Sequence, residues 1–262
     1  MGAKDHECPN KRKIEMGELK AIYAMWYREI RVFFREKSRI VASIINPLFF
    51  LLIFGGGLGN IEGFGAVGGQ VFVFPAIVGM TLLFTSIFFG LYIIWDRKVD
   101  FLKEVLVSPI SRLSMFIGKI LGGSTDSLIQ ATLVLVLGVF IGVQYTLLSI
   151  SLTFGFMFLA TTILVSIGLI MGSRMESPEG FQLITSFVVF PMFLLTLFPF
   201  DKLPLYLIPF AYMDPMTYAV DGLRGAMIGA NYFPLYVDAV VLAVLAGIFI
   251  AIGTYAFQKM KI

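Results

Sequence analysis

Long apolar stretches separated by short polar segments dominate the sequence. Six of them are long enough to cross the hydrocarbon core of a membrane, which is ~30 Å thick and takes about 20 apolar residues to span. They are residues 40–59, 71–94, 116–143, 149–173, 181–199 and 235–257. The third stretch begins with polar residues, so its membrane-embedded part is expected to start near Asp126. The pattern predicts an all-α integral membrane protein with six transmembrane helices.

The amino-terminal region has a different pattern. Residues 1–17 are polar and are predicted to be a disordered cytoplasmic tail, while residues 18–262 form a single transmembrane domain. Residues 18–39 place aromatic side chains on one helical face and arginines on another, which is typical of an amphipathic helix in the membrane interface. The alternative is a cytosolic extension of the first span. The residues that carry the prediction are Trp26, Arg28, Arg31, Phe33 and Arg35.

A charged island, residues 95–112, separates two long stretches without any charge. Within it Val99, Leu102, Val105 and Leu106 recur at helical spacing, which predicts a short amphipathic cytoplasmic helix. This helix is expected to end near residue 107, because Pro109 disfavours helical geometry at the residue before it. Its apolar stripe must be buried, either in lipid headgroups or in another protein.

The segment 200–234, between the fifth and sixth spans, is rich in proline and holds a helical pattern at 217–228 that is too short to span a membrane. Non-helical backbone at membrane depth must be buried in protein or line a wet cavity. We therefore expect one or two short re-entrant helices at the outer mouth. Asp214 and Pro215 supply a helix start, an acidic cap followed by proline. The outer motif comprises Asp214, Pro215, Tyr218, Asp221 and Arg224, with a structural ion pair expected for Arg224.

Composition and charge strengthen this interpretation. Hydrophobic residues make up 58% of the chain, charged residues 14%, and the mean hydropathy is +0.89. Of the 20 lysine and arginine residues, 18 fall on the side that holds the amino terminus. The positive-inside rule then predicts a multi-pass protein of the plasma (inner) membrane with both termini and the charged island cytoplasmic. The net charge of +3 reflects this topology and gives no reason to expect nucleic-acid binding.

The sequence lacks the residues that several kinds of binding site and catalytic site require. The single cysteine and the single histidine, Cys8 and His6, exclude a disulfide framework and a zinc site built from such ligands. No phosphate-binding loop of the form G-x-x-x-x-G-K-[ST] occurs, so the chain is not expected to be an enzyme. Asp126 is the one intramembrane carboxylate considered, either as a solvated or capping group or as a proton relay. The small-residue pairs Gly138/Gly142 and Gly168/Gly172 predict close helix packing within one subunit, or a dimer seam.

Three ordered motifs resemble those of ABC-2 type transporter permeases, including the daunorubicin-resistance and nodulation-export branches. The first is the island segment 96–112, which reads Asp-Arg-Lys-Val-Asp-Phe-Leu-Lys-Glu-Val-Leu-Val-Ser-Pro-Ile-Ser-Arg. The others are residues 176–182 and 214–224, and the resemblance covers roughly residues 20 to 260. Two departures stand out: Asp100 replaces a usual glycine, and residues 194–196 lack a frequent Ser-Gly pair.

The resemblance implies the permease subunit of an exporter that moves an amphipathic, lipid-linked or drug-like substrate outward. It also implies a homodimer and a separate ABC ATPase in two copies, with ATP and magnesium bound by that partner and no cofactor in this chain. The island helix would be the coupling helix, with Val99, Leu102, Glu104, Val105, Leu106 and Pro109 as the ATPase-coupling residues. A stand-alone secondary transporter or channel is the alternative, although paired broken helices are not evident. A membrane enzyme is a third possibility.

Overall fold

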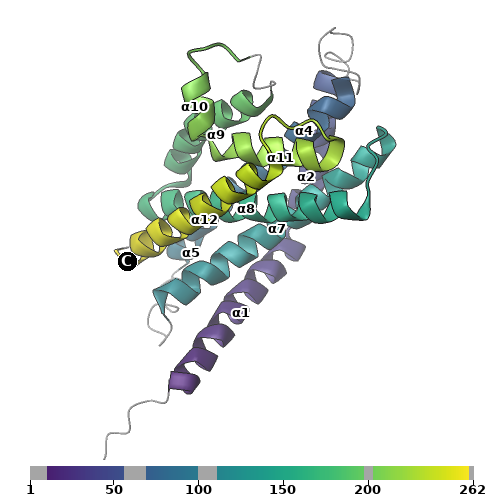
Figure 1. Ribbon diagram of the computed structural model, residues 1–262. Helices are drawn as coiled ribbons and strands as arrows, with labels where there is room; N and C mark the ends of the chain where they lie inside the picture. The colour runs from purple at the N-terminus through teal and green to yellow at the C-terminus, as the bar shows by residue number, and fades with distance from the viewer. Residues whose placement is uncertain (1–10, 56–68, 100–110, 198–202, 260–262) are drawn as a thin grey trace, which may run out of the picture.

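The computed structural model describes residues 11–55, 69–99, 111–197 and 203–259 of the chain, and all regular structure within them is helical (Figure 1). The helices of the first half are α1 (Lys11–Arg35), α2 (Lys37–Phe50), the π-helical turn η1 (Leu51–Gly55), α4 (Gly69–Phe88) and α5 (Leu91–Lys98). Those of the second half are α7 (Arg112–Phe140), α8 (Leu147–Arg174), α9 (Pro178–Leu197), α10 (Ile208–Met213), α11 (Pro215–Ile228) and α12 (Leu235–Gln258). The predicted all-α class is therefore confirmed for the described residues.

Five helices in the described ranges are long and apolar enough to cross a membrane. They correspond to the second to sixth predicted spans and are Gln70–Lys98, Arg112–Phe140, Leu147–Arg174, Pro178–Leu197 and Leu235–Gln258. The first predicted span is not among them. Its described part consists of the 14-residue helix α2, which contains Pro47, and the turn η1. Proline removes a backbone donor inside a helix, which explains why this region is not a regular α-helix throughout.

The core is built around α4, which contacts α7, α8 and α11. Residues 73–83 of α4 are all buried, and this helix carries no charged side chain. The predicted close packing at Gly168 and Gly172 lies within this chain, because a Cβ atom at Gly168 would lie 2.3 Å from the Ile87 carbonyl oxygen. Gly142 plays a different part: it has a φ of +89° in the turn after α7 and nothing near it.

Local capping explains several helix ends. The Ser111 hydroxyl accepts a hydrogen bond from the backbone N–H of Ser114, and Thr146 does the same for Ser149, so α7 and α8 begin at polar N-caps. α11 ends at Gly229, whose φ of +68° is the left-handed conformation that glycine adopts readily. Because these signals are local, the observed bounds of both long helices lie close to the predicted ones.

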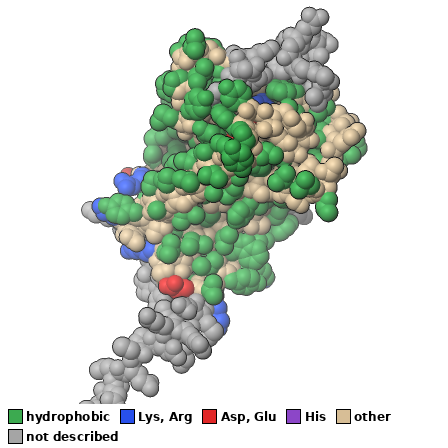
Figure 2. Space-filling model, viewed as in Figure 1, with side chains coloured by type: hydrophobic (Ala, Val, Ile, Leu, Met, Phe, Trp, Pro, Cys, Tyr) green, Lys and Arg blue, Asp and Glu red, His purple; other side chains and the backbone are tan. Residues whose placement is uncertain are grey.

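The faces of α9 and α12 that point away from the core are apolar. Exposed residues include Phe187 and Phe190 on α9 and Val240, Val244 and Ile248 on α12. Figure 2 shows hydrophobic side chains over most of the visible face, with charged side chains gathered mostly at its lower end. Such a distribution suits a helical bundle surrounded by lipid.

The helix α1 lies against the first half of α7 (Figure 1). It begins at Lys11, so the prediction of a disordered tail up to residue 17 is wrong for residues 11–17. It ends at Arg35, and Glu36 separates it from α2. Whether α1 also touches the membrane surface stays a prediction.

Candidate functional site

The helix α5 leads directly into the predicted coupling helix and is the part of that region which the structure describes. Val99 follows its last residue, donates its N–H to the carbonyl of Trp95, and is 68% exposed. The other predicted coupling residues, which lie outside the described residues, are Leu102, Glu104, Val105, Leu106 and Pro109. The candidate site is therefore the set of contacts that holds α5 in place.

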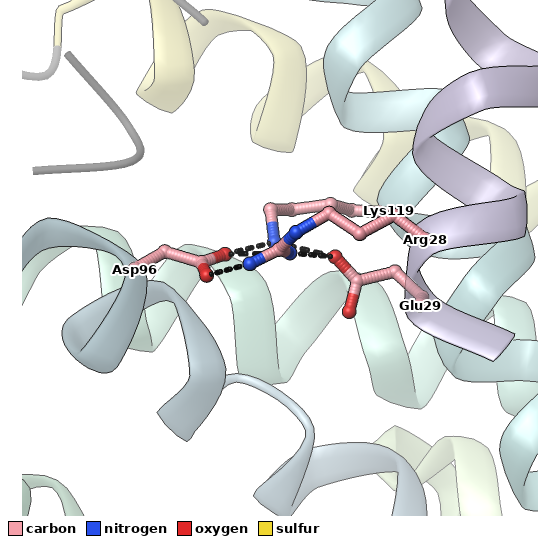
Figure 3. Close-up of polar contacts among 4 residues, drawn as sticks. All are labelled: Arg28, Glu29, Asp96 and Lys119. Carbon is pink, nitrogen blue, oxygen red and sulfur yellow. Dashed lines mark hydrogen bonds and ion pairs between the residues drawn. The ribbon is translucent and has the colours of Figure 1, made fainter. Parts of the chain in front are cut away.

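Four charged side chains from three helices meet beside α5, and we refer to them as the charge cluster (Figure 3). Lys119 of α7 donates to Asp96 of α5 at 2.6 Å and to Glu29 of α1 at 3.1 Å. Arg28 of α1 pairs with the same two carboxylates, at 2.6 Å to Asp96 and 2.8 Å to Glu29. Lys119 is fully buried, and Glu29 and Asp96 are each 4% exposed. The charge cluster thus joins α1, α5 and α7.

Small residues of α7 allow α1 to come close enough for these pairs. A Cβ atom at Gly122 would lie 2.6 Å from the Cβ of Glu29, and one at Gly118 would lie 2.7 Å from the Cβ of Met25. Further along the contact, the indole N–H of Trp26 donates to the Thr125 hydroxyl at 3.0 Å. The helix contact therefore depends on glycines that leave room for the charged side chains.

Two details of the predicted interfacial helix are corrected by these contacts. Arg28 was predicted to belong to a helix in the membrane interface, but it pairs with Asp96 and Glu29. Phe33 was predicted to lie on the aromatic face of the same helix, but it is 2% exposed and buried in protein. Arg31 and Arg35 do lie on the exposed side of α1, where the guanidinium of Arg31 sits 4.6 Å from the ring centre of Tyr27. One face of α1 therefore serves protein packing.

The charge cluster contains two cations and two anions, so it is electrically balanced. Burial lowers the pKa of Arg28, but the hydrogen bonds and charges of Asp96 and Glu29 together outweigh this effect and raise the pKa above its usual value. Sequence reasoning missed the cluster, because Asp96 was assigned to a solvated loop and Lys119 to the cytoplasmic charges. The available signal was that both residues adjoin apolar helices, where an ionisable group needs a partner.

A second set of contacts ties α5 to α8. The Arg97 guanidinium donates to the carbonyls of Ser173 at 3.0 Å and Met175 at 3.2 Å, at the carboxyl end of α8. Those carbonyls lack partners within the helix, and a cation there also complements the helix dipole. Next to them, a Cβ atom at Gly172 would lie 2.2 Å from the Gly90 carbonyl oxygen. α5 is consequently held by α1, α7 and α8 together.

Two grooves share the lining residue Phe88. The central groove measures about 570 Å³ and is lined by residues of α2, α4, α7 and α9, including Phe50, Phe84, Phe88, Gln130 and Phe190. The Glu36 groove measures about 530 Å³ and is lined by Glu36, Phe88, Leu91, Tyr92 and Trp95. Phe88 belongs to both, so the two grooves adjoin. Their size suits a small amphipathic molecule.

At the opposite end, residues 203–234 hold two short helices, α10 and α11, where the sequence predicts one or two, and the outer motif lies on α11 and its cap. Asp214 caps α11 by accepting the N–H of Met216 at 2.9 Å, and Pro215 occupies the first helical position. Burial raises the pKa of Asp214 to about 7, although the bond to Met216 acts in the opposite direction. The Tyr218 hydroxyl donates to the carbonyl of Tyr212 at 3.0 Å. The re-entrant placement of these helices stays a prediction.

The expected ion pair of Arg224 is wrong within the described residues. Its guanidinium donates to the carbonyl of Thr196 at 2.9 Å, while Asp221 accepts the backbone N–H groups of Tyr232 and Phe233 at 2.8–3.0 Å. Burial lowers the pKa of Arg224 to about 10, although the charge of Asp221 acts in the opposite direction. These contacts join α9, α11 and the segment between α11 and α12, so both residues have structural partners.

Two buried carboxylates inside the candidate spans complete the inventory. Asp126 is 3% exposed and accepts a hydrogen bond from Gln130 at 2.5 Å, so the interpretation as a solvated group is wrong. Asp238 of α12 is fully buried as well and was missed, since Asp126 was the one intramembrane carboxylate considered. Among the residues that the structure covers, no group of three or more histidine, cysteine, aspartate or glutamate side chains could hold a metal ion. Cys8 and His6 lie outside that part of the chain.

The fold and the site together indicate the class of protein to which the chain belongs. The described chain is a bundle of apolar helices with charged anchors at one end and short capped helices at the other, which is the organisation of a multi-pass membrane protein. Residues 20–228 match the family model for the ABC-2 type transporter. The chain belongs to this family of transport permeases.

Individual relatives support the assignment. The chain is 28% identical to the transport permease ycf38 of Cyanophora paradoxa, over 74% of this chain and 70% of the relative. It is 25% identical to the inner membrane transport permease YadH of Escherichia coli (strain K12), over 91% of this chain and 95% of the relative. It is 22% identical to DrrC of Mycobacterium tuberculosis, over 84% of this chain and 82% of the relative. That relative is named as a doxorubicin resistance ABC transporter permease protein.

Proposed function

We propose that this chain is the transmembrane subunit of an ABC exporter and moves an amphipathic, lipid-linked or drug-like substrate outward. ATP is hydrolysed by a separate subunit present in two copies, and two permease chains form the membrane domain of the plasma membrane transporter. The observation that carries the proposal is the anchoring of α5 by three neighbouring helices, directly before the proposed coupling segment. A helix fixed to three neighbours can pass a force on the coupling segment into the bundle.

The proposed mechanism follows from this anchoring. Closure of the ATPase pair pushes on a short helix around Val99–Leu106, whose apolar stripe lies in a groove of the partner. α5 takes up the motion, and the charge cluster and Arg97 spread it to α1, α7 and α8. The adjoining grooves beside α4 then change shape around the substrate. α1 braces the contact from the other side.

The test uses Leu102→Asp/Leu106→Asp together with the candidate ATPase. Burying each leucine in a partner contributes about 1.5–3 kcal/mol, so the charged double variant should weaken ATPase binding by roughly tenfold or more. Membrane level, co-purification of the ATPase and substrate-stimulated ATP turnover are measured. The conservative Leu102→Met/Leu106→Met variant, which keeps an apolar stripe, should retain both co-purification and turnover.

If the aspartate variant still binds the ATPase and transports at the normal rate, the coupling assignment is wrong. The segment around Leu102 and Leu106 would then rest on lipid. A stand-alone secondary transporter or channel would become the better interpretation of the function.

A further inference from the structure

The Glu36 groove combines a carboxylate with an aromatic wall. Glu36 lies at the non-helical position between α1 and α2, and the remaining lining residues come from α4 and α5. The Tyr92 hydroxyl donates to one carboxylate oxygen of Glu36 at 2.5 Å. This bond orients the carboxylate toward α5, the helix that carries Trp95. The groove thus places a negative charge beside the exposed ring of Trp95 and the partly buried rings of Tyr92 and Phe88.

Glu36 makes no ion pair with the residues whose side chains the structure describes. The ion pairs among these residues involve Arg28, Glu29, Asp96 and Lys119, and Glu36 is not among them. Tyr92 supplies its one side-chain hydrogen bond among those residues. An aromatic wall around a carboxylate that makes no ion pair attracts organic cations, because the ring quadrupoles and the carboxylate act on the same charge.

The ring of Trp95 already shows this attraction. Trp95 is 50% exposed, and the ammonium of Lys98 lies 5.4 Å from its ring centre. Lys98 is one helical turn from Trp95 on α5, so it is a natural local competitor for an external ammonium group. The competitor can be removed without touching the groove wall.

The other end of the groove is apolar and continues into the central groove. Phe88 lines both, and it stacks on Phe84 with ring centres 6.2 Å apart and planes 7° apart. Phe84 in turn meets Phe190 edge to face at 6.0 Å. A molecule with its head at Glu36 would therefore find an aromatic path for its apolar body.

We propose that Glu36, Tyr92 and Trp95 form the head-group subsite for a cationic amphiphile, with the apolar body lying along Phe88 and Phe84 into the central groove. The inference rests on the proposed function, because it names the chemical class of the exported substrate. An ammonium or pyridinium group is recognised by Glu36 and the indole ring, and the hydrocarbon part is recognised by the phenylalanines.

The experiment uses Trp95 as a reporter at the subsite. The chain has two tryptophans, so Trp26→Phe leaves Trp95 as the sole indole. The purified variant in lipid nanodiscs is titrated with N-dodecylpyridinium, a cationic amphiphile that quenches indole fluorescence on contact. Saturable quenching is expected, and its midpoint gives the apparent Kd.

Three further substitutions are compared in this background. Glu36→Gln keeps an acceptor for Tyr92 but removes the charge, and it should raise the Kd about tenfold. Lys98→Gln removes the competitor and should lower the Kd roughly twofold to threefold. Glu18→Gln is the matched control, because it removes the same charge from α1 at a distance of roughly 27 Å along the helix, and it should leave the Kd unchanged.

Folding of each variant is checked by gel filtration and thermal unfolding. Quenching that does not saturate, or a Kd that Glu36→Gln leaves unchanged in a folded variant, overturns the subsite. The titration contains no ATPase, so failure of the coupling test with Leu102 and Leu106 does not affect it. Conversely, loss of the Glu36 dependence leaves the ATPase coupling standing.

Discussion

The ammonium group of Lys119 has no contact with solvent and lies between the carboxylates of Glu29 and Asp96. Moving a charge out of water costs several kcal/mol, and the attraction of partners offsets this cost only when the geometry is good. Here two cations share two carboxylates, so each carboxylate has two charged donors. Such a buried network adds little net stability, but it fixes which helices meet, and we infer that it sets the position of α5.

Removing one member should therefore be more harmful than removing a balanced pair. Lys119→Met leaves two buried carboxylates with one guanidinium, and we expect a loss of roughly 3–5 kcal/mol in the free energy of unfolding. Lys119→Met/Glu29→Gln leaves Arg28 paired with Asp96 and should recover a large part of that loss. Thermal unfolding of the solubilised permease measures both, with Lys20→Met on the exposed side of α1 as control.

Equal stability of the single and double variants would show that the four side chains act independently. The charge cluster would then not be the device that positions α5.

Contacts between residues close in sequence could be predicted. The partners of residues that are far apart in sequence could not. Asp214 as a helix cap followed from one dipeptide, because capping involves residues two positions apart. Lys119 and Glu29 are 90 positions apart, and Arg28 and Asp96 are 68 apart. No spacing rule connects such residues, so an isolated charge next to an apolar stretch reveals that a partner exists but not which one.

At the scale of helices, α8 lies close to the junction of α4 and α5. The two backbones are in direct contact there, with no side chain between them. A Cβ atom at Gly168 would lie 2.3 Å from the Ile87 carbonyl oxygen, which is fixed backbone. Gly168→Ala should therefore push the helices apart and lower the free energy of unfolding by about 1–3 kcal/mol. It should also reduce ATPase stimulation, since α5 is displaced.

Gly155→Ala on the same helix is the matched control, because nothing lies within 4 Å of a Cβ atom there. Alanine is the better helix former, so this variant should be neutral or more stable by up to about 1 kcal/mol. Thermal unfolding and ATP turnover of the two variants are compared side by side. A Gly168→Ala variant as stable and active as Gly155→Ala would mean that the close contact is not required.

Helix positions were more predictable than helix faces. Five predicted spans appear with bounds close to those expected, because hydropathy and capping act over neighbouring residues. The first predicted span, 40–59, extends beyond the described residues, and its described part consists of α2 followed by the π-helical turn η1. The faces of α1 were partly misassigned, because an aromatic and basic pattern looks the same whether it meets lipid or another helix. In the structure Phe33 is buried in protein, and Arg28 is paired with Asp96.

At the scale of the whole molecule, hydrogen bonds gather several helix ends at one end of the bundle. Arg97 reaches the carboxyl end of α8, and Arg112 donates to the carbonyls of Phe257 and Gln258 at the end of α12, at 2.9 and 2.8 Å. The start of α7 and the ends of α5, α8 and α12 therefore lie at one end of the molecule. Most lysine and arginine residues belong to these segments and to α1, which is the distribution expected of a cytoplasmic side.

This orientation can be tested with the single cysteine, Cys8. If the end with α1 faces the cytoplasm, an impermeant maleimide should label Cys8 only after the membrane is opened. The matched control is Cys8→Ser with Gln144→Cys, which places the thiol in the exposed turn between α7 and α8. That turn lies at the opposite end, so this variant should be labelled in intact cells. Labelling of Cys8 in intact cells would show that the topology is the reverse of the predicted one. In that case 18 of the 20 lysine and arginine residues would lie on the outer side, against the positive-inside rule. The reversed topology would also move the coupling segment away from any cytoplasmic ATPase.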